Sequence, residues 1–176
     1  MLLYNCSAGL RIYYEDCKKI PFCWEVVKIR KSEFGEMNMS IYKLSCDWQI
    51  AIPDKWQGEY DKDNGQYVFY PDNSNLTIRI TPFHAERDGV LAPIEVMEDA
   101  YIRTIPVSAK LRNANLFNLD GFEVKMYEDT FIEDSNTIYV VYVGYYSAGE
   151  LLSISVWSTN KVECEQALNI LKTISV

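Results

Sequence analysis

The sequence predicts an α+β domain, in which a central antiparallel sheet carries helices on its faces. Short segments with alternating apolar and polar residues recur along most of the chain, as in strands with one buried and one solvated side. Two other segments have apolar residues at intervals of three and four, the spacing of a helix that packs one face against a sheet. With 176 residues, 48% of them hydrophobic, the chain suits one such domain around one core.

The first clear element is a strand that begins at Trp48 and ends at Pro53. Because side chains alternate along a strand, Trp48, Ile50 and Ile52 fall on one face of it. Pro53 ends the strand because proline has no N–H to donate to a neighbouring strand. Trp56 follows at once and is placed to cover the core. We therefore expect one side of this strand to be buried.

Two turn signals divide the next part of the chain into strands. The pair Asn64-Gly65 favours a tight hairpin, because both residue types tolerate positive φ angles, and a strand is expected at 67–70. A second turn is expected at 71–74. Residues 76–80 then alternate between isoleucine or leucine and polar side chains, which indicates a strand of an antiparallel sheet.

A helix is predicted for residues 93–105. Pro93 suits its first position, and Pro106 ends it. Its apolar residues form one stripe that faces the sheet: Ile94, Met97, Tyr101 and Ile105. Residues 107–120 show little periodicity and are expected to form a long connection.

Three long strands and a second helix are predicted for the rest of the chain. The strands begin near Phe122, Ile138 and Leu152, and the middle one is apolar on both sides, which requires cover on both faces and a central place in the sheet. Asn160 is suited to cap the final helix, with Glu163 three residues on as in a capping box. The helix then presents an apolar stripe: Cys164, Ala167, Leu168, Leu171 and Ile174.

Residues 1–38 differ in character from the rest and contain three of the five cysteines. We expect them to be an N-terminal extension, and residues 39–176 to be the single domain. One hypothesis is that Met39 is the true start of translation, because the codons of Gly35-Glu36 give a purine-rich run where a bacterial ribosome-binding site would lie. The alternative is a genuine extension that packs on the domain.

Composition excludes several classes of function. There are 17 basic and 25 acidic residues, a formal net charge of −8, which disfavours nucleic acid and suits solubility, a basic protein partner or a bound cation. No apolar run approaches the ~20 residues that span a bilayer, and the start lacks the features of a secretory signal. We therefore expect a cytoplasmic protein with no membrane partner. Five scattered cysteines indicate reduced thiols, neither a disulfide framework nor a paired zinc site.

The order of these elements resembles the PsbP-like fold, which is also found in a Ran-binding nuclear-import factor and in adaptor proteins of bacterial type VI secretion. The opening Trp48–Trp56, the helix Pro93–Ile105, the three strands within Phe122–Trp157 and the C-terminal helix carry the resemblance, which covers roughly residues 40–176. It implies an αβα sandwich that has no catalytic residues and works by binding. A fold does not fix the partner.

The densest acidic segment of the chain is the main candidate site. Its better functional interpretation is a strand end that meets a basic partner, with an exposed Phe131 or Tyr127 as an aromatic anchor. The alternative is a sheet edge that charge keeps soluble. The predicted protein-binding residues are Tyr127, Glu128, Asp129, Phe131, Glu133 and Asp134.

The sole histidine gives a second candidate. If the segment is extended, His84, Glu86 and Asp88 lie on one side and offer one nitrogen and two oxygen ligands to a cation. The alternative is a solvated charged loop before Gly89. A single imidazole also leaves few groups for acid–base catalysis at neutral pH.

The sequence thus predicts a bacterial protein-binding domain with no enzymatic activity and no cofactor, acting as an adaptor, chaperone or immunity-type partner. The alternative function is binding of a small ligand or a metal cation. Cys46 and Cys164 are interpreted as small core residues.

Overall fold

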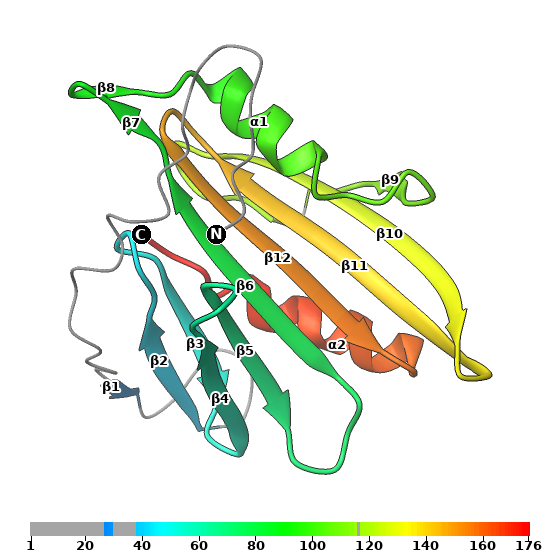
Figure 1. The fold of residues 1–176 in the computed structure, drawn as a ribbon. Helices are drawn as coiled ribbons and strands as arrows, with labels where there is room; N and C mark the ends of the chain where they lie inside the picture. The colour runs from blue at the N-terminus through cyan, green and yellow to red at the C-terminus, as the bar shows by residue number, and fades with distance from the viewer. Residues whose placement is uncertain (1–26, 30–37, 116) are drawn as a thin grey trace.

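A seven-stranded antiparallel sheet dominates the computed structural model, which describes residues 27–29, 38–115 and 117–176 (Figure 1). Most of the predicted N-terminal extension therefore lies outside the described residues. In spatial order the strands are β4 (Trp56–Asp61), β5 (Gln66–Pro71), β6 (Thr77–His84), β12 (Glu150–Ser158), β11 (Asn136–Tyr146), β10 (Glu123–Glu133) and β9 (Lys110–Arg112). The α+β class predicted from the sequence is confirmed.

Within the described residues, two smaller sheets accompany the main one. The first has the order β1 (Val27–Ile29), β2 (Met39–Lys43) and β3 (Gln49–Pro53), and the second is the hairpin of β7 (Glu86–Arg87) and β8 (Val90–Leu91). The predicted strand after Trp48 is confirmed as β3, although it belongs to the small sheet. Gln49 and Ser175 exchange main-chain hydrogen bonds of 2.8 and 3.1 Å, which join β3 to the C-terminal segment.

The predicted turns are confirmed by backbone angles that ordinary residues rarely adopt. Gly65 has a φ of 63° between β4 and β5, and Asn73 has a φ of 71° between β5 and β6. Asp134 and Ser135, with φ of 48° and 67°, form the turn between β10 and β11. Two consecutive positive φ angles are typical of the type I′ turn, whose twist matches that of the flanking strands.

The two helices of the described chain contact opposite faces of the main sheet. The buried Met97 and Tyr101 of α1 (Ile94–Ile102) belong to a cluster that includes Tyr146 and Leu151. The helix α2 (Lys161–Leu171) packs on the larger cluster, which includes Tyr145 and Leu152. Tyr145 and Tyr146 are neighbours on β11, and neighbouring side chains of a strand point to opposite faces. No described helix is long and apolar enough to cross a membrane.

The larger cluster is the core that the sequence predicts. Trp48, Ile50 and Ile52 are each 0% exposed, and Leu152, Ile154 and Val156 of β12 are at most 1% exposed. The residues of the predicted stripe are all buried: Cys164, Ala167, Leu168, Leu171 and Ile174. The last of them, Ile174, lies beyond the helix, which ends at Leu171.

Three local predictions need correction. The helix α1 ends at Ile102, before the predicted limit, because the chain turns there and the Thr104 hydroxyl donates to the Tyr101 carbonyl at 2.7 Å. The segment 107–120 contains β9, which sequence periodicity did not indicate. Asn160 does cap α2, accepting the Val162 N–H at 2.9 Å, but Glu163 bonds Ser158 instead of completing a capping box.

Candidate protein-binding surface

The helix α1 covers only one end of the sheet face on which it packs. It lies over the end where β6 stops and β12 begins, near Tyr146 and Leu151 (Figure 1). Farther along the same strands, toward the turn between β10 and β11, no described element lies over this side (Figure 1). Large side chains of the strands themselves cover this part of the sheet.

Aromatic side chains from two strands meet on this uncovered part. The rings of Phe131 on β10 and Trp157 on β12 lie 5.7 Å apart at 78°, an edge-to-face arrangement that is favourable for aromatic pairs. They meet across β11, whose Val140 lies directly opposite Trp157 and is 1% exposed. We call this surface the open face and define it by Arg79, Phe131, Ile138, Val140, Ser155 and Trp157.

Polar contacts fix the Trp157 side chain in place. Its indole N–H donates to the Ser155 hydroxyl at 2.9 Å, and the guanidinium of Arg79 on β6 lies 5.8 Å from the centre of its ring. This distance is within the range of a cation–π interaction. The open face therefore presents a half-buried, oriented tryptophan with a neighbouring exposed cation.

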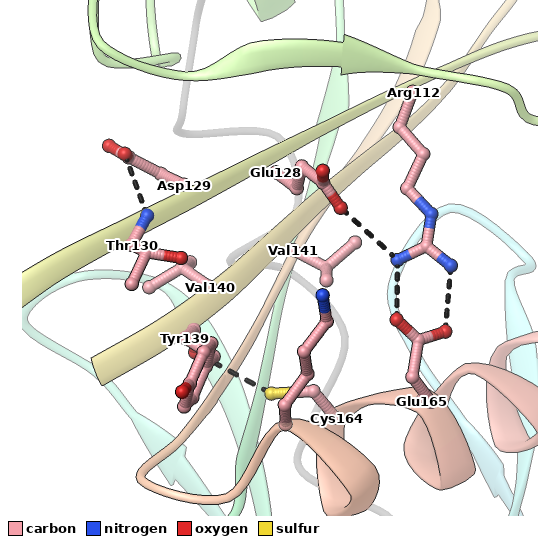
Figure 2. Close-up of a pocket in the computed structure, with 10 residues that line it drawn as sticks. Arg112, Glu128, Asp129, Thr130, Tyr139, Val140, Val141, Cys164 and Glu165 are labelled. Carbon is pink, nitrogen blue, oxygen red and sulfur yellow. Dashed lines mark hydrogen bonds and ion pairs between the residues drawn. The ribbon is translucent and has the colours of Figure 1, made fainter. Parts of the chain in front are cut away.

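The structure separates the predicted binding residues between the two faces of β10. Tyr127, Asp129, Phe131 and Glu133 alternate onto the side of the open face, and Asp134 follows in the turn. Glu128 points to the side of α2. There it lies 3.6 Å from Arg112, which also forms two hydrogen bonds of 2.7 Å with the carboxylate of Glu165 (Figure 2). This arginine lowers the pKa of Glu165.

The predicted aromatic anchors are not fully exposed. Phe131 packs on Trp157, and Tyr127 packs on Tyr101 of α1 with ring centres 6.2 Å apart, so both are half-buried. The physical reason is that the strand places both rings on a face that already carries other aromatic residues. The exposed apolar residue of this segment is Ile132, at 78%, which the sequence analysis did not single out.

A small pocket lies between β10, β11 and α2, beside the Arg112–Glu165 pair (Figure 2). Its volume of about 50 Å³ is large enough for water but is far below the several hundred Å³ of ligand sites. Cys164 lines it, is 1% exposed and has a pKa that burial raises to about 11. The thiol therefore stays protonated at neutral pH, which confirms its interpretation as a core residue.

The structure only partly assembles the predicted cation ligands. His84 Nε2 lies 3.5 Å from Glu86 Oε2, but Asp88 is 92% exposed and contacts Arg87. The segment is not simply extended: Asp88 and Gly89, with φ of 54° and 78°, reverse the chain between β7 and β8. Among the described residues, no group of three or more potential ligands is placed to hold a metal ion.

Glu150 is the partner of His84 that sequence reasoning missed. It lies directly opposite His84 in the β12–β6 register, and its Oε1 is 2.5 Å from His84 Nδ1. Its other oxygen, Oε2, and the indole nitrogen of Trp48 are also buried. Burial raises the pKa of Glu150, and the contacts with His84 and Trp48 oppose this rise.

We expect His84 to titrate above its ordinary pKa of 6.5, because the hydrogen bond to Glu150 favours the imidazolium. The change Glu150→Gln should lower the pKa of His84. Glu86→Gln should lower it less, because that carboxylate is farther away. His84 is the sole histidine in the sequence, so proton NMR follows its ring signal directly. An unchanged pKa in Glu150→Gln would contradict this assignment.

The same shift sets the sign of a pH effect on stability. A folded-state pKa above the unfolded value gives stability that is complete below about pH 6.5 and is lost as pH rises through the folded value. Burial also raises the pKa of Glu150, so the ionisation of this carboxyl as pH rises likewise lowers the stability of the folded state. The wild type should therefore lose stability relative to Glu150→Gln as pH rises, as denaturant unfolding at several pH values would show.

Comparisons with known proteins identify a fold and no function. No family model matches the chain, and no curated protein matches it. A structure from Bacteroides thetaiotaomicron, solved at 1.50 Å, is similar with a TM-score of 0.54 and 13% identity over 72% of this chain. The chain spans 44% of that protein's length. This likeness concerns the fold alone.

A second similar structure is LpqN, described as involved in cell envelope biogenesis of Mycobacterium tuberculosis. It has 13% identity and a TM-score of 0.46, with 86% of this chain and 91% of that chain covered. A TM-score this low supports no inference about the present chain.

Proposed function

We propose that this chain is a non-enzymatic, cytoplasmic protein-binding domain, and that its partner docks on the open face. The observation that carries the proposal is the Phe131–Trp157 pair, flanked by Arg79, on a part of the sheet that no described element covers. Tryptophan and arginine are among the residues that most often dominate binding energy at protein interfaces. Their positions are already fixed by contacts within the sheet, so little ordering entropy is lost on binding.

The charge of the surrounding residues favours a basic partner. Asp129, Glu133 and Asp134 lie at the end of β10 beside the open face, and the whole chain has a formal net charge of −8. Complementary charges at the rim of an interface mainly accelerate association and select partners. An adaptor, chaperone or immunity-type protein that holds a basic protein fits this distribution.

The fold supports the same class of function. We assign the layers to the PsbP-like αβα sandwich that the sequence resembles, with α1, the main sheet and α2 as its three layers. In this chain α1 is short and leaves much of its face uncovered. The uncovered part of this face can contact a partner protein. The resemblance to the PsbP-like fold likewise implies a protein that functions by binding.

Capture from a native lysate with matched variants tests the proposal. We expect a basic protein that the wild type retains and Trp157→Ala loses by tenfold or more, the order of effect of an interface hot spot. Val162→Ala is the control, because Val162 is an exposed apolar residue, at 62%, on α2 at the other side of the sheet. Thermal unfolding of each variant would show that the fold is retained.

Arg79→Ala gives a second measurement, in which the indole of Trp157 remains but the exposed cation beside it is removed. It should weaken retention of the same partner. The proposal is wrong if the wild type retains no protein. It is also wrong if Trp157→Ala and Arg79→Ala retain every captured protein as well as the wild type does.

A further inference from the structure

The outer edge of β10 is only partly occupied. β11 pairs with β10 along its whole length, from Glu123 to Glu133. β9 pairs on the other side only with Met126, Tyr127 and Glu128. Among the described residues, none forms a strand beside the segment from Asp129 to Glu133. This segment is therefore an open strand edge next to the turn between β10 and β11.

Strand geometry shows which main-chain groups face that edge. Glu133 and Asn136 flank the two-residue turn and pair directly, so they exchange hydrogen bonds across the hairpin. Because such pairs alternate, the N–H and C=O of Ile132 and Thr130 point away from β11. The same alternation directs Met126 and Glu128 toward β9, in agreement with the observed pairing.

One of these outward groups is already occupied. The Thr130 N–H donates to the side chain of Asp129 at 2.8 Å (Figure 2). The other oxygen of Asp129 accepts the Ser108 hydroxyl at 2.6 Å. Asp129 thus occupies the outward N–H at the end of the edge segment that lies nearer to β9. The outward groups of Ile132 and the carbonyl of Thr130 remain for a strand that approaches from the turn.

The side chains along the edge indicate what such a strand would carry. Ile132 is 78% exposed, and no ion pair joins Glu133 or Asp134 to another residue within the described ranges. The segment 128–134 contains four acidic residues and no basic one. A second copy of this chain would bring its own four carboxylates to the same place, which is unfavourable at such distances. A basic segment would neutralise them.

We propose that the β10 edge from Thr130 to Asp134 binds an extended, lysine- or arginine-rich segment of the partner protein as an added strand. The inference rests on the proposed function and supplies its mode of recognition. Main-chain hydrogen bonds from Ile132 give affinity, as in other cases of strand addition. A basic side chain of the segment lies on the same face as Glu133 and close to Asp134 in the turn, and the small apolar residue next to it in the segment contacts Ile132 on the other face.

Amide hydrogen exchange with a synthetic probe tests this mode of binding. The probe is a short peptide in which lysine alternates with valine, added to the full chain at up to about 1 mM. We expect the Ile132 amide to exchange more slowly with the peptide present, and the Phe131 amide, which faces β11, to change little. The same peptide with alternate main-chain nitrogens methylated, in either register, should give less protection because strand pairing is blocked.

Charge variants provide the matched control. The pair Glu133→Gln and Asp134→Asn should weaken peptide binding about tenfold at low salt, and asparagine tolerates the positive φ at position 134. Ile132→Pro removes an outward N–H without removing a bond to β11, and should also weaken binding. Unchanged exchange at Ile132 would overturn the proposal, and the edge would then be one that charge keeps soluble.

The two proposals fail in different ways. A captured partner that depends on Trp157, but binds Ile132→Pro as well as the wild type, would overturn strand addition and leave the open face as the docking site. Protection of Ile132 by the peptide, with no partner that depends on Trp157, would overturn the open face and retain the edge.

Discussion

Replacing Trp48 with alanine should lower the free energy of unfolding by about 3–5 kcal/mol, the cost typical of removing a large buried aromatic side chain. Trp48 is 0% exposed, and its ring lies 4.7 Å from that of Phe122 and 6.3 Å from that of Tyr145. Trp48, which precedes β3, therefore packs against the start of β10 and against β11 of the main sheet. Urea denaturation of the full chain would measure the loss.

Two variants sharpen this prediction. Trp48→Phe should cost less than half as much, because an aromatic ring remains and still fills most of the volume of the indole. Trp56→Ala should also cost less, because Trp56 is only half-buried. If Trp48→Ala and Trp56→Ala cost the same, the central place of Trp48 in the core would be wrong.

Replacing Gly144 with valine should also be strongly destabilising, although valine favours strands. A Cβ atom built at Gly144 would lie 2.7 Å from three ring atoms of Tyr101, whose side chain is fully buried. Either α1 or β11 must then move. Overpacking of this kind costs about 1–3 kcal/mol, and a β-branched side chain belongs at the upper end of that range. Denaturant unfolding is the measurement.

A double-mutant cycle identifies the cause. In a Tyr101→Ala background the ring is absent, so Gly144→Val should cost much less than in the wild type, and the difference is the interaction energy of the pair. Ser153→Val is a useful comparison, because Ser153 lies opposite Gly144 on β12. Additive effects of the two changes at 101 and 144 would show that α1 does not pack as described.

The sequence predicts those elements whose burial imposes a period. β3, β12 and the stripe of α2 are long enough for alternation or helical spacing to be visible, and each was confirmed. β7, β8 and β9 have two or three residues, too few for a period. Such strands are defined by the neighbour with which they pair, and a single sequence does not show that neighbour.

The candidate sites divide in the same way. Composition alone identified the acidic segment of β10, but its open edge depends on where β9 stops. Phe131 and Trp157 meet because β11 lies between their strands, and His84 meets Glu150 across 66 positions of sequence. Contacts of this kind follow from strand order, which local patterns leave undetermined.

The bonds between β3 and the C-terminal segment have a consequence for synthesis on the ribosome. Besides the Gln49–Ser175 pair, the Ala51 N–H donates to the hydroxyl of Thr173 at 3.0 Å, across 122 positions of sequence. The nascent chain therefore cannot complete the core around Trp48 until residues 171–175 have left the exit tunnel. Until then the apolar side of β3 stays accessible, so translation pauses or chaperones that act before these residues emerge should influence the yield of folded protein.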